Sequence, residues 1–137
     1  MEARMRFMFV LNMPEGTWIS KEIVTRIVEW KRRMAAEGVH LTGNPLKPPG
    51  MTTTIYRRTD GSFCISEAPL EDATRIFYAF EIIDCANMDE AVRIARGHPA
   101  LEFDHCFLEV REIWDSMGED VMGEEYYLKA EEEKLDC

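Results

Sequence analysis

The chain has 137 residues, of which 16 are Lys or Arg and 26 are Asp or Glu, and its formal net charge is −10. This length suits one domain, which can bury a hydrophobic core without disulfides or a structural metal. The acidic balance argues against proteins that bind the phosphate backbone of nucleic acids or an anionic membrane surface.

The acidic charge is concentrated at the C-terminus. Residues 115–137 contain nine acidic and two basic residues, whereas residues 1–114 contain 17 and 14. We therefore expect a nearly balanced domain at 1–114 and an acidic C-terminal extension at 115–137 that is helical or partly disordered. Because the domain shows no basic patch, nucleic acid is not an expected partner.

Features of several other protein classes are absent from the sequence. No apolar run has the roughly 18 residues of a membrane helix, and the N-terminus does not resemble a signal peptide. The four cysteines form no CxxC pair, which favours reduced, mostly buried thiols in a cytoplasmic protein. Asp104 and His105 lack a third ligand at a recognisable spacing, so no metal is predicted, and no motif indicates an organic cofactor.

The first third of the chain predicts a strand, a helix and a short strand. Residues 5–11 are apolar on both faces, which indicates a central strand. Ser20 is the expected N-cap of a helix, and Gly38 is expected just after its last turn. A short strand is predicted at 39–42, and the prolines of 43–50 predict an extended or turn-rich link without helix.

A hairpin and a further strand follow. Residues 52–58 and 63–66 are the predicted hairpin strands, joined by a turn at Asp60 and Gly61. Residues 76–83 predict the next strand.

The last predicted elements are a helix that begins near Asn87 or Met88 and a strand at 106–113. His98 follows this helix, where its dipole would favour the charged imidazole, and we expect a structural role. His40 is expected at the surface or at a strand edge.

The order of strand, helix, four strands, helix and strand describes a ferredoxin-like α+β fold with an extra hairpin. Its sheet is antiparallel, and both helices are expected on one sheet face. The other face then needs a cover, which predicts a homodimer that stacks sheet on sheet or shares a barrel.

Several segments resemble the YCII-related (DGPF) family in sequence, order and spacing. They are 46–49 (LKPP), 52–57 (TTTIYR), 60–61 (DG), 76–82 (IFYAFEI), 88–92 (MDEAV), 95–99 (ARGHP) and 108–111 (LEVR). The DGPF signature itself appears as EAPL at 67–70.

The resemblance implies a dimeric ferredoxin-like α/β barrel over about residues 5–114. It implies no established activity for most members, although a few relatives look like small-molecule lyases, isomerases or dehalogenases. The His–Asp pair proposed for some members cannot be transferred, because 11–20 contains no His.

Strand alternation suggests one candidate site. In the last strand, His105, Phe107, Glu109 and Arg111 share the face opposite the helices. His105 and Glu109 could transfer a proton, and Arg111 could bind an anion. Glu81 would join them if its side of the 76–83 strand also faces away from the helices.

Two more residues are candidates for substrate binding. They are Arg57 in the hairpin and Glu67 in the following loop. The leading hypothesis is a protein that binds a small anionic metabolite on the sheet face opposite the helices. The alternatives are a lyase or isomerase that uses His105, Glu109 and Arg111, ion pairs at a dimer interface, and a non-catalytic regulatory or protein-interaction module.

Overall fold

The computed structural model describes residues 4–69 and 75–114, and it divides the chain into two units. Of these residues, 4–46 and 75–114 belong to the first unit, and 47–69 belong to the second. The predicted acidic extension at 115–137 lies outside the described residues.

The first unit begins with strand β1 (Met5–Pro14), helix α1 (Lys21–Ala36) and strand β2 (His40–Pro45). The Ser20 hydroxyl accepts a hydrogen bond of 3.2 Å from a backbone N–H of the first helical turn, which confirms the predicted N-cap. Gly38 ends the helix with a φ of 74°, a left-handed conformation that glycine adopts at little cost.

The second half of this unit contains strand β5 (Arg75–Cys85), helix α2 (Met88–Ala95), the 3-10 helix η2 (Pro99–Glu102) and strand β6 (Phe107–Ile113). The Asn87 side chain accepts a hydrogen bond from a backbone N–H of the first turn of α2. The predicted elements of this half are therefore present, with small differences at their ends.

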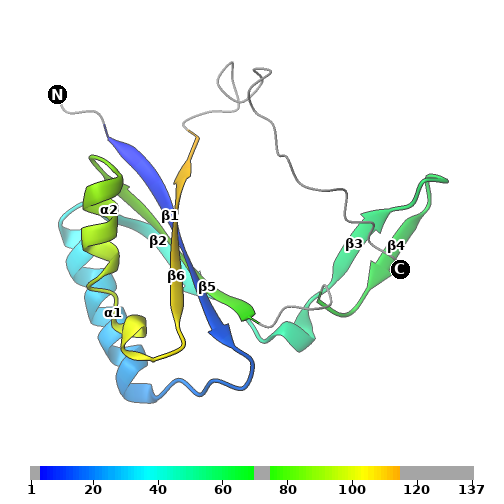
Figure 1. The fold of residues 1–137 in the computed structure, drawn as a ribbon, viewed down its shortest axis with the longest axis horizontal. Helices are drawn as coiled ribbons and strands as arrows, with labels where there is room; N and C mark the ends of the chain where they lie inside the picture. The colour runs from blue at the N-terminus through cyan, green and yellow to red at the C-terminus, as the bar shows by residue number, and fades with distance from the viewer. Residues whose placement is uncertain (1–3, 70–74, 115–137) are drawn as a thin grey trace. The chain divides into compact units, whose positions relative to one another are not determined.

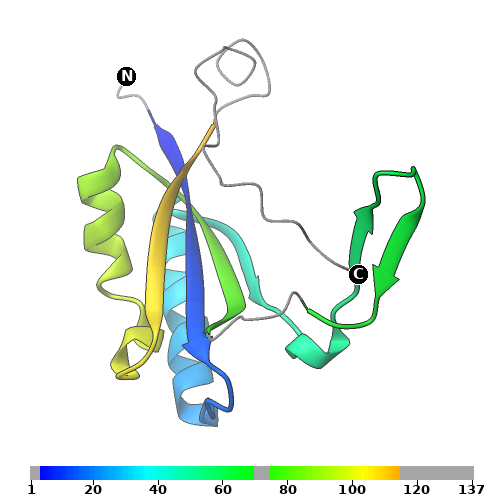
Figure 2. The same cartoon turned by 45° about the vertical axis from the view of Figure 1, so that its right-hand side comes forward.

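The four strands of the first unit form one sheet in the order β2-β5-β1-β6, and all neighbours are antiparallel. Both α-helices lie on the same side of this sheet, as predicted (Figures 1 and 2). With the hairpin, the described residues form an α+β structure, with six strands in antiparallel sheets and two α-helices. This arrangement is compatible with a ferredoxin-like fold.

The hydrophobic core lies between the sheet and the helices. Alternate side chains of β1 point toward the helices, and Phe7, Phe9 and Leu11 are fully buried. Trp30 from α1 and Ala91 from α2 close the core on the helix side. Burial of each large side chain stabilises the fold by roughly 2 kcal/mol before entropy is counted.

A bulge interrupts the pairing of β1 with β5. Leu11 pairs with Ala79 and Asn12 pairs with Phe77, so Tyr78 is an extra residue in β5. The extra residue reverses the alternation of side chains beyond it. Tyr78 packs against the core, and Phe77 is 39% exposed.

The second unit contains the 3-10 helix η1 (Pro49–Met51) and the predicted hairpin of β3 (Thr54–Arg57) and β4 (Phe63–Ser66). Gly61 has a φ of 91° in the connecting turn, as the hairpin prediction requires. The prediction of a link without helix is wrong at η1. Proline is tolerated at its first position, where the missing N–H has no intrahelical partner anyway.

The cysteines differ in their bonding. Cys85 and Cys106 are buried thiols rather than disulfides, which confirms the expectation for these two. Cys64 is also buried, but it is disulfide-bonded, so the expectation of a reduced thiol is wrong there.

Candidate functional site

Strand β6 presents alternate side chains to the two faces of the sheet. Leu108 and Val110 pack against the core, and Phe107, Glu109 and Arg111 are exposed on the face away from the helices. The predicted alternation is therefore confirmed from Phe107 to Arg111, because β6 pairs with β1 without a bulge. The placement of His105 in this strand is wrong, since the strand begins at Phe107.

Neighbouring strands supply polar and apolar groups to this outer face. The Asn12 Nδ2 donates a hydrogen bond of 2.8 Å to Glu109 Oε1. Met8 lies opposite Arg111 in the register with β6, and Val10 lies opposite Glu109. The outer face therefore combines the Glu109 carboxylate and the Arg111 guanidinium with apolar side chains, and it also includes the exposed Arg6 of β1.

Arg111 forms no ion pair or hydrogen bond within residues 4–69 and 75–114. A guanidinium carries five N–H donors, so this side chain is available to bind an anion. His105 lies in the turn before β6 and is exposed. Its predicted role in proton transfer with Glu109 stays a prediction.

Glu81 does not join this face. It pairs with Phe9 in the register of β5 with β1, and both side chains point toward the helices. Glu81 is 1% exposed, on the opposite side of the sheet from Glu109. The condition under which Glu81 would complete the predicted site is therefore not met.

Arg57 and Glu67 lie in the second unit, in β3 and just after β4. Both are exposed. Their predicted roles in substrate binding stay predictions.

A different polar cluster lies inside the first unit, under α1. The Glu81 carboxylate contacts His40 Nε2 at 2.9 Å through Oε2 and Lys31 Nζ at 3.3 Å through Oε1. Lys31 Nζ also donates a hydrogen bond of 2.9 Å to the Gly43 carbonyl oxygen. The cluster therefore connects α1, the edge strand β2 and β5.

Burial dominates the electrostatics of Glu81. Removal from water raises the pKa of this carboxyl, while the charges and hydrogen bonds of Lys31 and His40 lower it. A carboxyl whose pKa is raised by burial is suited to act as a general acid or base.

The prediction for His40 is confirmed, whereas the prediction for His98 needs correction. His40 occupies the edge strand as expected, but its side chain is only 8% exposed because it turns inward to Glu81. His98 is 3% exposed, and its Nδ1 accepts a hydrogen bond from the Ala100 N–H, so it caps η2. Its ring lies 4.6 Å from that of Trp30.

The expected charged form of His98 is therefore wrong. Burial lowers the pKa of His98 to about 4, and the positive charges of Lys31 and His40 act in the same direction. The imidazole is neutral at pH 7, and its proton is on Nε2 because Nδ1 is an acceptor.

We predict that His98 makes the protein less stable in acid. Its pKa is lowered from 6.5 to about 4, so the unfolded chain binds a proton first as the pH falls through this range. Stability is complete above pH 6.5 and falls by about 3 kcal/mol on the way to pH 4. Urea unfolding between pH 7 and 4 measures this loss.

The matched variant is His98→Asn, because an amide oxygen can still accept the hydrogen bond from the Ala100 N–H. The variant should lose less stability than the wild type over the same pH range. Equal losses in the two proteins would contradict the assignment to His98.

Sequence reasoning missed the roles of Lys31, His40 and Asn12. Lys31 lies among three consecutive basic residues, and the sequence does not show which of them points inward. The available signal was that Lys31 and His40 lie close in sequence to apolar residues, which favours a buried carboxylate as their partner.

Comparisons with known proteins leave the chain without an assigned family. No protein-family model and no curated protein matches it. In the part of the chain that the structure describes, no group of three or more His, Cys, Asp or Glu side chains is arranged to hold a metal ion. Among the same residues, no helix has the length and apolar character required to cross a membrane.

Proposed function

We propose that this protein is a homodimer that binds a small anionic metabolite over the outer face of its four-stranded sheet. Arg111 is the residue that contacts the anion. The observation that carries the proposal is the exposed Arg111 guanidinium, without a partner among the described residues, on a sheet face that also carries apolar side chains.

The surroundings of Arg111 suit a small organic anion. The hydrogen bond from Asn12 orients Glu109, so this carboxylate is held in place two residues before Arg111. Half-buried Phe80 and Ile82 of β5 supply apolar surface on the same face. Ligand sites commonly combine such apolar surface with a few fixed polar groups.

Dimerisation is part of the same proposal. Within residues 4–46 and 75–114, both α-helices cover one face of the sheet and no element covers the other (Figure 2). In a two-fold dimer, the same surface of each copy meets itself, so the outer faces of the two sheets would enclose the ligand between them. The motifs that resemble the YCII-related family support a dimeric ferredoxin-like barrel, and membership of that family belongs to the proposal.

The test is calorimetric titration of the full chain with a panel of small mono- and dicarboxylates. For each carboxylate that binds the wild type, Arg111→Gln should weaken binding by about tenfold or more, because hydrogen bonds to charged groups contribute roughly 1.5–3 kcal/mol. Sedimentation of the same samples should show a dimer.

Arg93→Gln is the matched control. Arg93 is an exposed arginine on α2, and its guanidinium is 3.9 Å from the Glu90 carboxylate. This variant should bind as the wild type does. The proposal fails if no carboxylate binds, if both variants weaken binding equally, or if the protein is a monomer.

A further inference from the structure

We propose a second binding site, for a small phosphorylated metabolite or inorganic phosphate, in a pocket between α1 and the end of α2. The pocket has a volume of about 280 Å³. It is lined by residues of α1, of η2 and of the segment between α2 and η2, all in the first unit. These elements lie on the helix side of the sheet, away from Arg111.

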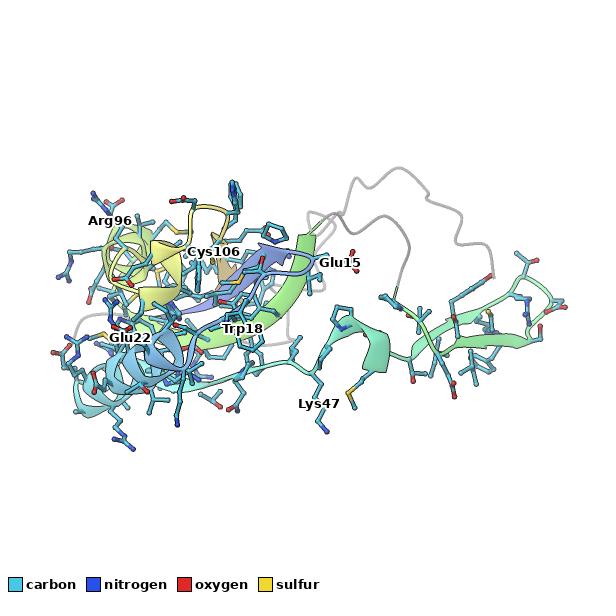
Figure 3. All side chains as sticks on the ribbon, turned by 90° about the horizontal axis from the view of Figure 1, so that it is seen from below. Glu15, Trp18, Glu22, Lys47, Arg96 and Cys106 are labelled. Carbon is cyan, nitrogen blue, oxygen red and sulfur yellow. The ribbon has the colours of Figure 1, made fainter. Side chains whose placement is uncertain are left out.

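Three arginines line this pocket. Arg26 of α1 forms a two-pronged hydrogen-bonded ion pair with Glu102 of η2. This pair connects the two elements and neutralises both charges. Arg33 of α1 and Arg96, which follows α2 (Figure 3), complete the set.

Arg33 and Arg96 supply unpaired positive charge. Neither side chain forms an ion pair or hydrogen bond within the described ranges 4–69 and 75–114. The carboxylate of Glu29 also lines the pocket and forms no ion pair there among the same residues. The unpaired groups therefore carry a net charge of +1.

The inner wall of the pocket is neutral and compact. His98 lines it as an uncharged, buried imidazole that is held by its hydrogen bond to the Ala100 N–H. Gly97 beside it has no side chain to occupy the space. Pro99 and Leu101 add apolar surface.

These features favour phosphate over a single carboxylate. Two guanidinium groups from separate elements can share the oxygens of one phosphate. Each guanidinium can donate two parallel hydrogen bonds to that phosphate. A phosphate monoester presents three terminal oxygens, so Arg33 and Arg96 can both contact it, and the net charge of +1 on the unpaired groups offsets part of its negative charge. The volume is near the lower limit of ligand pockets, roughly 300 Å³, so the ligand is small.

The test is an NMR titration of the full chain with inorganic phosphate and pyrophosphate at constant ionic strength. We expect saturable shifts of the Gly97 and Ala100 amide signals. Arg33→Gln and Arg96→Gln should each weaken binding by about tenfold. Glu29→Gln should strengthen it, because it removes a negative charge from the pocket.

Two controls separate this site from other sources of binding. Arg32→Gln removes the charge of Arg32, which is next to Arg33 on α1 but does not line the pocket. Arg111→Gln removes the proposed anion contact of the sheet face. Both should bind phosphate as the wild type does. The proposal fails if Arg32→Gln weakens binding as much as Arg33→Gln, if acetate binds as tightly as phosphate, or if the shifts do not saturate.

Discussion

Gly43→Ala is expected to destabilise the protein by about 3 kcal/mol, because the site has no room for a methyl group. A Cβ atom at this position would lie 2.5 Å from the Phe80 carbonyl oxygen and 2.6 Å from Glu81 Oε1. The first contact is with backbone of the neighbouring strand, which cannot rotate away. The second is with the carboxylate that binds Lys31 and His40.

Urea unfolding monitored by circular dichroism measures this loss. Gly50→Ala is the matched control, because an added Cβ there would contact no atom within 4 Å. The control should change the free energy of unfolding by less than about 0.5 kcal/mol. If both variants unfold at the same urea concentration as the wild type, the close packing of β2 against Glu81 is disproved.

Lys31→Met is expected to cost roughly 2–3 kcal/mol. It leaves the buried Glu81 carboxylate with His40 as its remaining side-chain partner, and loss of one member of a buried ion pair is strongly destabilising. The value is below that of a fully buried pair because Lys31 keeps 21% of its side chain exposed. The Gly43 carbonyl also loses its hydrogen bond from Lys31 Nζ.

The pH dependence of this variant has a definite sign. Lys31 supplies the largest of the effects that lower the pKa of Glu81, so its removal raises that pKa further above the ordinary value. A raised folded-state pKa means that the folded protein holds its proton more tightly than the unfolded chain. The deficit of Lys31→Met should therefore grow as the pH rises through the pKa of the folded carboxyl.

A double-mutant cycle separates charge from packing. Glu81→Gln should remove much of the penalty of Lys31→Met, because a neutral amide needs no positive partner. Arg32→Met, at an exposed position of the same helix, is the control and should change the free energy of unfolding by less than about 0.5 kcal/mol. Additive effects of Lys31→Met and Glu81→Gln would show that the two side chains do not interact.

Local rules predicted much of the fold from single segments of sequence. Ser20 caps α1, and Gly38 ends it, because their effects depend on the adjacent turn alone. The faces of β6 were predicted correctly, since Leu108 and Val110 are apolar and Glu109 is not.

The same rules failed where both faces of a strand are apolar. In β5 the alternation is ambiguous, and the bulge at Tyr78 changes it partway along the strand. Glu81 therefore faces the helices, and Phe77 lies opposite Asn12. A shift of one residue moves a side chain to the other face, so pairing between distant strands decides its surroundings.

The candidate sites show the same division between local and distant effects. Hydrophobic alternation identified Arg111 as an outward residue from its own strand alone. The Lys31–His40–Glu81 cluster and the pocket that joins Arg33 to Arg96 required tertiary structure. Periodicity and capping depend on hydrogen bonds and contacts a few residues apart, whereas burial and ion pairing depend on which distant segments the sheet and its helices bring together.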